Sequence, residues 1–207
     1  MDNEKLQRWM QENVAFLEDA YISEKEPWKQ SGFSGPEDRW IRCRKPIADC
    51  MNRDGTFLDI GCANGYLLEC VLKWKEQEGI RIEPNGLDIG RKLVEMTKER
   101  LCRSKNVHVG NALTWEPPQH YDFVRTELVY VPLESQRDFV LRLLDAFVKP
   151  GGKLIVCEYR SRRKVYDEPW INEVLIDMGF EVTEVRSGWY DGKELTRAAV
   201  IERDAMP

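Results

Sequence analysis

An apolar run that ends in an acid and turns on glycine constrains this chain more than any other feature. The run covers residues 56–60, and the turn that follows reads Asp59-Ile60-Gly61-Cys62-Ala63-Asn64-Gly65. Gly61 permits backbone conformations that other residues avoid, and a helical apolar pattern begins after Gly65. In α/β proteins, a strand that turns on glycine into a helix brings a nucleotide-like ligand to the positive end of that helix. We therefore predict a ligand-binding loop over residues 59–65.

Strand and helix patterns alternate from residue 56 onward. Short apolar runs bounded by turn residues predict strands over residues 56–60, 80–88, 107–109, 122–126, 153–158, 180–185 and 195–201. Helical patterns separate most of them, and the segment Lys149-Pro150-Gly151-Gly152 is expected to end one of these helices. Such alternation produces right-handed crossovers and a mostly parallel sheet with helices on both faces. The last two strands are expected to pair antiparallel, because the loop predicted over residues 188–193 is too short for a parallel return.

Residues 1–54 carry helical periodicity and no strand pattern. Apolar residues between Leu6 and Leu17 follow a helical period, which the stretch from Ser31 to Pro36 interrupts. A second helix is expected to turn four side chains inward, namely Trp40, Cys43, Ile47 and Met51. We therefore expect a helical cap or lid over residues 1–54 and a ligand-binding α/β domain over residues 55–207.

The charge balance and the cysteine pattern exclude several classes of function. The 207 residues include 31 Lys and Arg and 36 Asp and Glu, a net charge of −5, so a non-specific nucleic-acid binder is not expected. Six cysteines without a Cys-x-x-Cys pair, and two histidines, match neither a zinc signature nor a disulfide framework. The first residues lack the apolar core of a signal peptide, and no apolar run approaches the ~20 residues of a membrane helix. We expect a cytoplasmic protein with reduced thiols, no metal site and no membrane span.

The spacing within the first loop discriminates among nucleotide-like ligands. A dinucleotide fingerprint needs further glycines at the positions that Ala63 and Tyr66 occupy. A phosphate-binding P-loop needs a Gly-Lys-Ser/Thr ending, which this loop lacks. Asp59 would repel a pyrophosphate, whereas its carboxylate suits a ligand that carries an ammonium group.

Two further loops follow the next two strands. Asp88 ends the second strand, where a carboxylate can accept hydrogen bonds from both hydroxyls of a ribose; capping of the next helix is the alternative. Asn111 follows the third strand, where its amide could reach an adenine amino group while apolar neighbours cover the ring. An ordinary turn is the alternative for Asn111, because Asn after Gly is common in turns.

Taken in series, the three loops resemble those of the class I S-adenosylmethionine-dependent methyltransferases. The resemblance covers residues 56–202 and includes residues 148–156, which look like that family's passage from a helix into the fifth strand. It implies a Rossmann-like, seven-stranded, mostly parallel sheet with an antiparallel last hairpin, and S-adenosylmethionine as cofactor. The residues that it assigns to the cofactor are Asp59 near the ammonium group, Gly61 and Gly65 around the methionine part, Asp88 at the ribose, and Asn111, Ala112 and Leu113 at the adenine, with Ala63, Ile89 and Arg125 as further cofactor-binding residues. Ala63 is a departure, because many members of the family carry a glycine there.

The end of the fourth strand faces the reacting groups in that family. Arg125 is expected to pair with a carboxylate of the cofactor or the acceptor, and Glu127 to act as a general base or to bind an amine. We expect these two side chains to point to opposite faces and to have separate roles, with a simple ion pair between them as the alternative. Tyr130 and Tyr159 complete the catalytic candidates, Tyr159 as a pocket residue. Both histidines are expected to be structural, so catalysis would rest on proximity and orientation.

The resemblance predicts in-line methyl transfer from S-adenosylmethionine to an oxygen, nitrogen or carbon atom of a small molecule. Contacts with this acceptor are expected from residues 15–45, 125–132 and 159–170. Three alternatives stay open. An RNA methyltransferase would use the basic segment Arg160–Lys164, a cyclase of the cofactor's aminobutyl chain would release methylthioadenosine, and a binding module would hold the cofactor without turnover.

Overall fold

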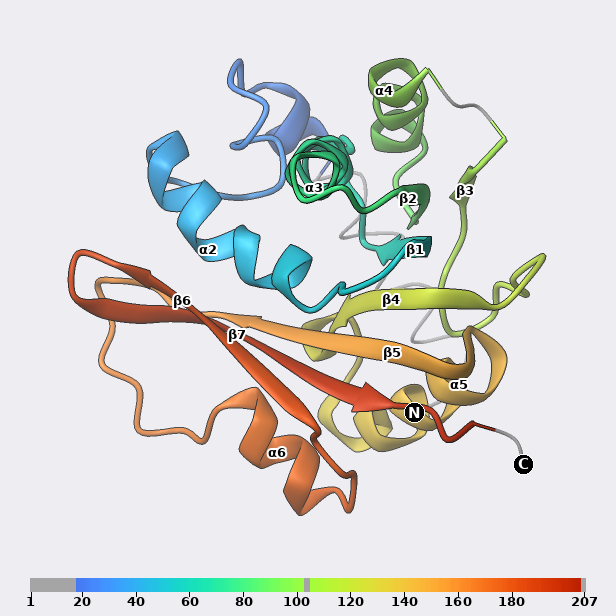
Figure 1. The fold of residues 1–207 in the computed structure, drawn as a ribbon. Helices are drawn as coiled ribbons and strands as arrows, with labels where there is room; N and C mark the ends of the chain where they lie inside the picture. The colour runs from blue at the N-terminus through green and yellow to red at the C-terminus, as the bar shows by residue number, and fades with distance from the viewer. Residues whose placement is uncertain (1–17, 103–104, 206–207) are drawn as a thin grey trace.

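One seven-stranded sheet organises the described residues, 18–102 and 105–205, of the computed structural model (Figure 1). Its order is β3-β2-β1-β4-β5-β7-β6. The strands are β1 (Gly55–Ile60), β2 (Ile82–Asp88), β3 (Val107–Val109), β4 (Tyr121–Glu127), β5 (Val148–Tyr159), β6 (Glu184–Tyr190) and β7 (Lys193–Glu202). The first five pair in parallel, and β7 lies antiparallel between β5 and β6. The predicted Rossmann-like α/β fold with an antiparallel last hairpin is therefore confirmed.

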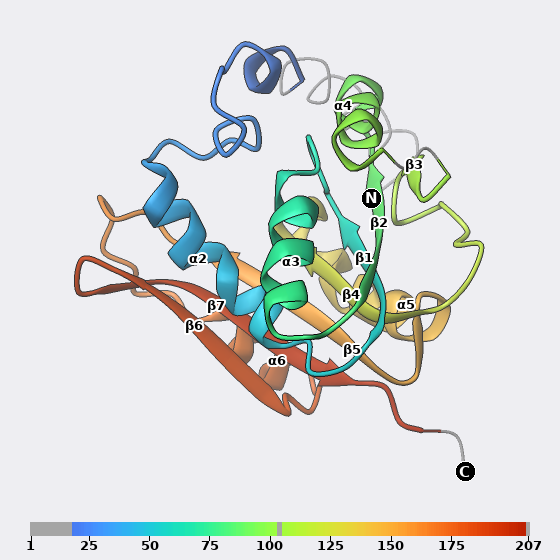
Figure 2. The same ribbon diagram turned by 45° about the horizontal axis from the view of Figure 1, so that its top comes forward.

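Helices cover both faces of this sheet, as Figure 1 and Figure 2 show. The helices are α2 (Glu37–Asp49), α3 (Tyr66–Gln77) and α4 (Arg91–Leu101) on one face, and α5 (Gln136–Ala146) and α6 (Ile171–Asp177) on the other. Successive side chains of a strand point to opposite faces, so the strands supply two separate cores. Phe57 packs with the layer of α2 to α4, and its neighbour Leu58 packs with α5 and α6.

The described part of the N-terminal segment is helical, as predicted. Residues 18–22 form a helical turn, and α2 buries Trp40, Cys43 and Ile47. The helix predicted between Leu6 and Leu17 lies outside the described residues. The domain boundary at residue 54 and the role of residues 1–54 as a lid stay predictions.

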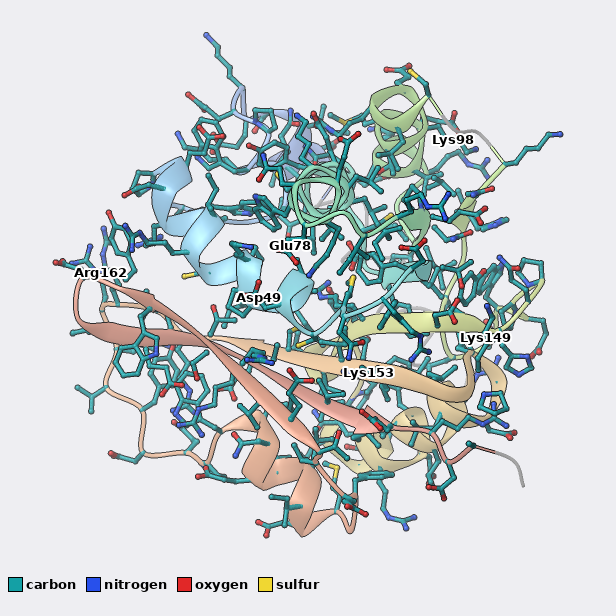
Figure 3. All side chains as sticks on the ribbon, viewed as in Figure 1. Asp49, Glu78, Lys98, Lys149, Lys153 and Arg162 are labelled. Atoms are coloured by element: carbon teal, nitrogen blue, oxygen red, sulfur yellow. The ribbon has the colours of Figure 1, made fainter. Side chains whose placement is uncertain are left out.

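Lys153 ties the end of α2 to the sheet. It lies on β5 below the last turn of α2, where Asp49 is also found (Figure 3). Its Nζ donates to the carbonyl oxygen of Cys50 at 3.2 Å and to Glu184 at 3.1 Å. This buried cation therefore connects the helical layer with both the centre and the edge of the sheet.

The predicted sixth strand is wrong in its position. The structure places β6 at residues 184–190 rather than 180–185, and the loop predicted over residues 188–193 shrinks to the turn Asp191-Gly192. Both turn residues have positive φ, 53° and 72°, which is the geometry of a tight hairpin turn. An Asp-Gly pair between two strands is a strong hairpin signal. The Asp191-Gly192 pair therefore indicates where β6 ends and β7 begins.

The predicted end of the fifth helix is also wrong. Helix α5 ends at Ala146, and the segment from Lys149 to Gly152 lies inside β5 instead of stopping a helix. The pairing of β4 with β5 shifts between Tyr121 and Phe123, and Gly151 has a φ of 71°. The Pro-Gly-Gly segment therefore forms an irregularity of the strand, where glycine tolerates the strained backbone.

Candidate functional site

A cavity of about 370 Å³ opens at the carboxyl ends of β1, β2 and β4, beside the loop that follows β3. The strand order runs β3-β2-β1 in one direction and β4-β5 in the other, so the cavity sits at the point where the order reverses, the usual ligand site of open α/β sheets. The predicted site residues that line it are Asp59, Gly61, Ala63, Asp88, Ile89, Asn111, Ala112, Leu113, Arg125, Glu127 and Tyr130. The fold therefore brings together eleven residues from four separate loops.

Gly65 and Tyr159 are the two predicted residues that do not line the cavity. A Cβ at Gly65 would lie 2.7 Å from the Cγ2 of Thr97, so Gly65 allows α3 to approach α4 instead of facing a ligand. The hydroxyl of Tyr159 accepts a hydrogen bond from Arg125 at 3.0 Å, and the guanidinium carbon of Arg44 lies 3.4 Å from the centre of its ring. The structure thus places Tyr159 behind two cavity residues rather than in the pocket wall.

The first loop bends through three residues with positive φ: Gly61 at 79°, Ala63 at 47° and Gly65 at 75°. The N–H groups of Gly61 and Cys62 both donate to the carbonyl oxygen of Leu87, at 2.8 and 3.3 Å, so the loop is tied to β2. A Cβ at Gly61 would collide with the hydroxyl of Tyr130. Only a glycine therefore lets the backbone of this loop form the cavity wall beneath Tyr130.

Ala63 has a left-handed backbone conformation, which favours glycine. An alanine at this position of the loop is therefore unusual. A left-handed alanine costs about 1–2 kcal/mol, partly offset by its smaller chain entropy, so Ala63→Gly should raise the free energy of unfolding by about 0.5–1 kcal/mol. Urea denaturation measures this change. Ala48→Gly within α2 is the control and should lower stability by about 1 kcal/mol. A loss of stability in Ala63→Gly would contradict the strain.

Arg125 is the centre of a buried polar network. Asp59 and Arg125 are register partners on β1 and β4, so their side chains meet across the two strands. Arg125 Nη1 donates to Asp59 Oδ1 at 3.1 Å, and Nη2 donates to Glu127 Oε1 and to the hydroxyl of Tyr159. Tyr130 donates to the same Glu127 oxygen at 2.9 Å. The expectation that Arg125 and Glu127 point to opposite faces is wrong, because alternate residues of a strand share a face; the alternative of an ion pair between them holds.

Burial sets the protonation of this network. Asp59 is 1% exposed and its Oδ2 atom has no hydrogen-bond partner among the described residues. Burial raises the pKa of Asp59 to about 6, against the opposing attraction of Arg125. Burial and the neighbouring Glu127 raise the pKa of Tyr130 well above its usual value, so its phenol stays protonated and donates a hydrogen bond. Tyr130 is therefore a hydrogen-bond donor rather than a base at neutral pH.

Asp88 connects the first loop, residues 59–65, with the start of α4. Its Oδ2 accepts from the Ala63 N–H at 2.9 Å and its Oδ1 accepts from the Gly90 N–H at 2.8 Å. Burial raises its pKa, and the charge of Glu18 adds to the effect. The contact with Gly90 at the start of α4 resembles the capping role that the sequence left open. Each carboxylate oxygen has a further lone pair that can accept a hydrogen bond from a ligand in the cavity.

Residues 15–45, the N-terminal range expected to contact the acceptor, supply cavity residues that the sequence does not single out. Glu18 lines the cavity and its Oε1 accepts from the Lys92 N–H of α4 at 2.8 Å. The buried side chain of Asn64 in the first loop donates to the Pro27 carbonyl at 3.0 Å and to Gln30 Oε1 at 2.8 Å. These contacts join residues 34 or more positions apart, so no local pattern predicts them. They fasten residues 18–30 over the loop that lines the cavity.

Helix α2 adds two more cavity residues, Trp40 and Arg44. Trp40 is 2% exposed, and its ring lies 4.7 Å from that of Tyr66. Its indole N–H has no hydrogen-bond partner among the described residues. The helical pattern of the sequence marks Trp40 as an inward-facing residue and gives no signal for Arg44.

Metal and thiol chemistry find no support in this cavity. Within residues 18–102 and 105–205, no group of three His, Cys, Asp or Glu side chains is arranged to hold a metal ion. Cys62 lines the cavity, but burial raises its pKa well above the usual value, so its thiol stays protonated. Over the same residues, no helix is both long and apolar enough to cross a membrane.

Comparison with known proteins gives a family and a fold. A family model described as a methyltransferase domain matches residues 36–199. Among solved structures, the chain is similar to the N-methyltransferase NodS from Bradyrhizobium japonicum WM9, crystallised with S-adenosyl-L-homocysteine, at 16% identity and a TM-score of 0.64 over 92% of this chain and 97% of that one. No curated protein sequence is similar enough to count as a match.

Two further solved structures share the fold. Magnesium protoporphyrin IX methyltransferase from Synechocystis PCC 6803, with bound S-adenosylmethionine, has 17% identity and a TM-score of 0.59 over 93% of this chain and 97% of that one. The [4+2]-cyclase SpnF has 14% identity and a TM-score of 0.62 over 93% of this chain and 94% of that one. At these identities the likeness concerns the fold alone, and the fold hosts both methyl transfer and other chemistry.

Proposed function

The chain belongs to a family of methyltransferase domains, and on this premise we propose that it transfers the methyl group of S-adenosylmethionine to an oxygen, nitrogen or carbon atom of a small molecule. The family match over residues 36–199 supports the predicted resemblance of the chain to the class I enzymes. The observation that carries the proposal is one cavity into which Asp59, Asp88 and Asn111 all project from the ends of consecutive strands.

The cavity fits the chemistry of this cofactor at each end. The unpartnered Oδ2 of buried Asp59 is an acceptor for an ammonium group, and the glycine at 61 lets the Tyr130 hydroxyl come close to the loop that forms the cavity wall. Asp88 offers carboxylate lone pairs for ribose hydroxyls, and the buried Ala112 covers an aromatic ring beside Asn111. When bound, the cofactor supplies an electrophilic methyl group on a sulfonium. The residues of the chain bind and orient the two reactants and exclude water from the cavity. The rate enhancement of such a transfer arises from this positioning.

Arg125 is a positioning residue in this proposal. Its terminal nitrogens already donate to Asp59, Glu127 and other protein oxygens, so it holds the two carboxylates in place rather than binding a carboxylate of a ligand. Glu127 lines the cavity and keeps its Oε2 atom without a partner among the described residues, so this oxygen is the candidate acceptor for a proton or an amine of the substrate.

A small acceptor is favoured over RNA by the state of the basic segment Arg160–Lys164. Arg160 pairs with Glu158 at 2.6 Å and stacks on Trp170 at 3.7 Å. Arg162, in the segment after β5, lies beside the tip of the hairpin of β6 and β7 and pairs with Asp191 of its turn (Figure 3). These partners engage Arg160 and Arg162, two of the four cations of the segment, which weakens its attraction for phosphate groups.

The proposal is tested by binding and by product analysis. We expect S-adenosylhomocysteine to bind in isothermal titration calorimetry and to raise the melting temperature. Incubation of the protein with S-adenosylmethionine labelled in the methyl group and a polar small-molecule extract should label a small molecule, whereas purified RNA should stay unlabelled. Methylthioadenosine as the released product would favour a cyclase, and absence of binding would overturn the proposal.

Cofactor affinity should depend on pH through Asp59. Because the pKa of Asp59 is raised to about 6, its carboxylate is neutral below that pH and loses its attraction for an ammonium group. The dissociation constant of S-adenosylhomocysteine should therefore rise about tenfold per pH unit below about pH 6 and stay level above it. Calorimetry between about pH 5 and about pH 8 measures this step. Asp59→Asn should bind weakly at every pH and show no step, and a pH-independent affinity of the unsubstituted protein would contradict the assignment.

The Asp59 carboxyl group gives folding stability the opposite pH dependence to that of cofactor binding. Between its usual pKa of 3.8 and about 6, the folded protein holds the Asp59 proton where the unfolded chain has released it. The contribution of Asp59 to the free energy of unfolding is therefore largest below pH 3.8 and decreases as the pH rises through this range. Binding and stability measurements thus separate the two effects of one carboxyl group.

A further inference from the structure

Two side-chain oxygens of residues that line the cavity have no hydrogen-bond partner among the described residues. Glu127 Oε1 accepts from Arg125 and Tyr130, whereas its Oε2 accepts from no described residue. The hydroxyl of Tyr21, in the helical turn of residues 18–22, likewise makes no hydrogen bond with a described residue. Both residues lie in ranges that are expected to contact the acceptor. They are therefore candidates for binding its reacting atom.

Tyr21 lies close enough to Glu127 to sense its charge. Burial raises the pKa of the Tyr21 hydroxyl, and the negative charges of Glu127 and Asp88 raise it further. The phenol therefore stays protonated, and its oxygen can both donate and accept a hydrogen bond. Gly32 gives this hydroxyl its room, because a Cβ there would lie 2.7 Å from the Tyr21 oxygen. Tyr21 and Glu127 thus offer a ligand one neutral hydroxyl and one carboxylate oxygen within a single cavity.

The charges of the cavity wall favour a cationic acceptor. Among the described residues that line the cavity, four carboxylates face two guanidinium groups and no lysine or histidine, so two negative charges are in excess when all six groups are ionised. S-adenosylmethionine carries one net positive charge, from a sulfonium, an ammonium and a carboxylate. The cavity with cofactor therefore keeps one negative charge, which a cationic acceptor balances and an anionic acceptor increases. The residues counted are Glu18, Asp59, Asp88, Glu127, Arg44 and Arg125.

Apolar side chains stand next to this polar point. Val129 and Val131 follow Glu127 in the chain and line the cavity. Val131 is buried, whereas Val129 is 73% exposed, and Ile89, which also lines the cavity, is 38% exposed. Cavity residues this exposed lie at its mouth, where the carbon skeleton of a ligand can cover them. The cavity therefore combines a polar point for one atom of the acceptor with an apolar edge for the rest of it.

We infer that the acceptor is a primary or secondary amine on an apolar carbon skeleton and that Glu127 and Tyr21 bind its nitrogen, an inference that rests on the proposed function. An aliphatic amine is protonated at neutral pH, and its ammonium group matches the excess negative charge of the cavity. The nitrogen can donate to Glu127 Oε2 and to the Tyr21 oxygen at the same time. A neutral alcohol would leave the excess charge unbalanced.

Methyl transfer needs the nitrogen lone pair, which the ammonium form does not have. Glu127 Oε2 takes one proton from the nitrogen, so that an N–H bond breaks and an O–H bond forms. The freed lone pair then forms a bond to the methyl carbon, the C–S bond breaks, and its electron pair stays on sulfur. The product leaves as a methylated ammonium ion, and Glu127 passes its proton to water. Each methyl group transferred therefore releases one proton.

The test uses a small-molecule extract labelled uniformly with nitrogen-15 and divided by cation exchange at neutral pH into a retained and an unretained fraction. Each fraction is incubated with the protein and with S-adenosylmethionine that carries carbon-13 in its methyl group. We expect the retained fraction to accept the methyl group, and the nuclear magnetic resonance signal of the methyl carbon to be split by a directly bonded nitrogen-15. Transfer to an oxygen or carbon atom gives an unsplit signal and overturns the inference while the proposed function stands.

Variants test the roles of Glu127 and Tyr21. Glu127→Gln keeps an oxygen for Arg125 and Tyr130 but removes the charge. It should lower kcat/KM for the retained fraction about 10- to 100-fold and change the Kd of S-adenosylhomocysteine, measured by calorimetry, less than about threefold. Tyr21→Phe should lower kcat/KM about 3- to 10-fold. Glu134→Gln is the matched control, because Glu134 is exposed, follows the same strand and does not line the cavity.

The possible results separate this inference from the proposed function. Equal losses of kcat/KM and of affinity for S-adenosylhomocysteine in Glu127→Gln would mean that Glu127 only supports the cavity, and an unchanged kcat/KM would mean that it does not bind the acceptor. Either result overturns the inference while the proposed function stands. If S-adenosylhomocysteine binds but neither fraction accepts a methyl group, or if it does not bind at all, the proposed function fails and the inference fails with it.

Discussion

Arg125→Met should lower the free energy of unfolding by about 3–5 kcal/mol, the largest stability effect that we expect from one substitution in the cavity wall. Arg125 is buried between Asp59 and Glu127, and it donates to both carboxylates. Its removal leaves Asp59 buried without a cation, because the other oxygen of Asp59 already has no partner among the described residues. The penalty comes from this uncompensated charge more than from the lost attraction.

Urea denaturation followed by tryptophan fluorescence measures this effect. Arg81→Met is the matched control, because Arg81 forms its ion pair with Asp54 at the surface, where such pairs contribute at most about 1 kcal/mol. The double variant Arg125→Met, Asp59→Asn should recover part of the loss, since it removes the buried charge as well. A loss below about 1 kcal/mol in Arg125→Met would show that the network does not depend on its cation.

Asp88→Ala should weaken the binding of S-adenosylhomocysteine by about 100-fold or more, because two charge-assisted hydrogen bonds to a ribose are lost. Asp88 ends β2 and lines the cavity directly beneath the first loop. Calorimetry gives the affinity, and the rise in melting temperature caused by the ligand should largely disappear. Asp54→Ala is the control, because Asp54 also accepts from a backbone N–H, that of Arg81 at 2.8 Å, outside the cavity.

Asp88 also braces the loop, so the experiment must separate the two roles. Its oxygens accept from Ala63 and Gly90, and alanine would free both N–H groups. An analogue of S-adenosylhomocysteine without ribose hydroxyls makes the distinction. The unsubstituted protein should prefer the hydroxylated ligand, and Asp88→Ala should bind both alike. If Asp88→Ala keeps the full preference, the ribose assignment is wrong and Asp88 only supports the loop.

Much of the cavity could be predicted because its residues lie at the ends of strands. Asp59, Asp88 and Asn111 each follow a short apolar run, and parallel strands deliver their carboxyl ends to one edge of the sheet. The pattern of each segment is local, so it is readable in the chain itself. The Asp191-Gly192 turn is equally local, because an Asp-Gly pair between two strands is typical of a two-residue hairpin turn.

The functional groups that were missed depend on contacts between distant segments. Glu18 meets the start of α4, Asn64 meets residues 27–30, and Arg44 rests on the ring of Tyr159. Each pair is separated by tens of residues, and each partner alone looks like an ordinary polar or aromatic residue of a helix or a loop. The role of Arg125 changed for the same reason, because pairing across β1 and β4 sets it against Asp59.

The sequence by itself therefore determined the order of strands and helices, the glycine turn and the three strand ends that line the cavity, since these follow from periodicity and backbone preference within short segments. Only the tertiary structure decided which charges neutralise one another and which remain for a ligand. Arg125 became a buried brace because two carboxylates surround it, whereas Arg44 kept a free guanidinium because its neighbours are aromatic rings. Charge pairing depends on distances in space and on burial, and both arise only when β1 pairs with β4 and α2 packs against the sheet.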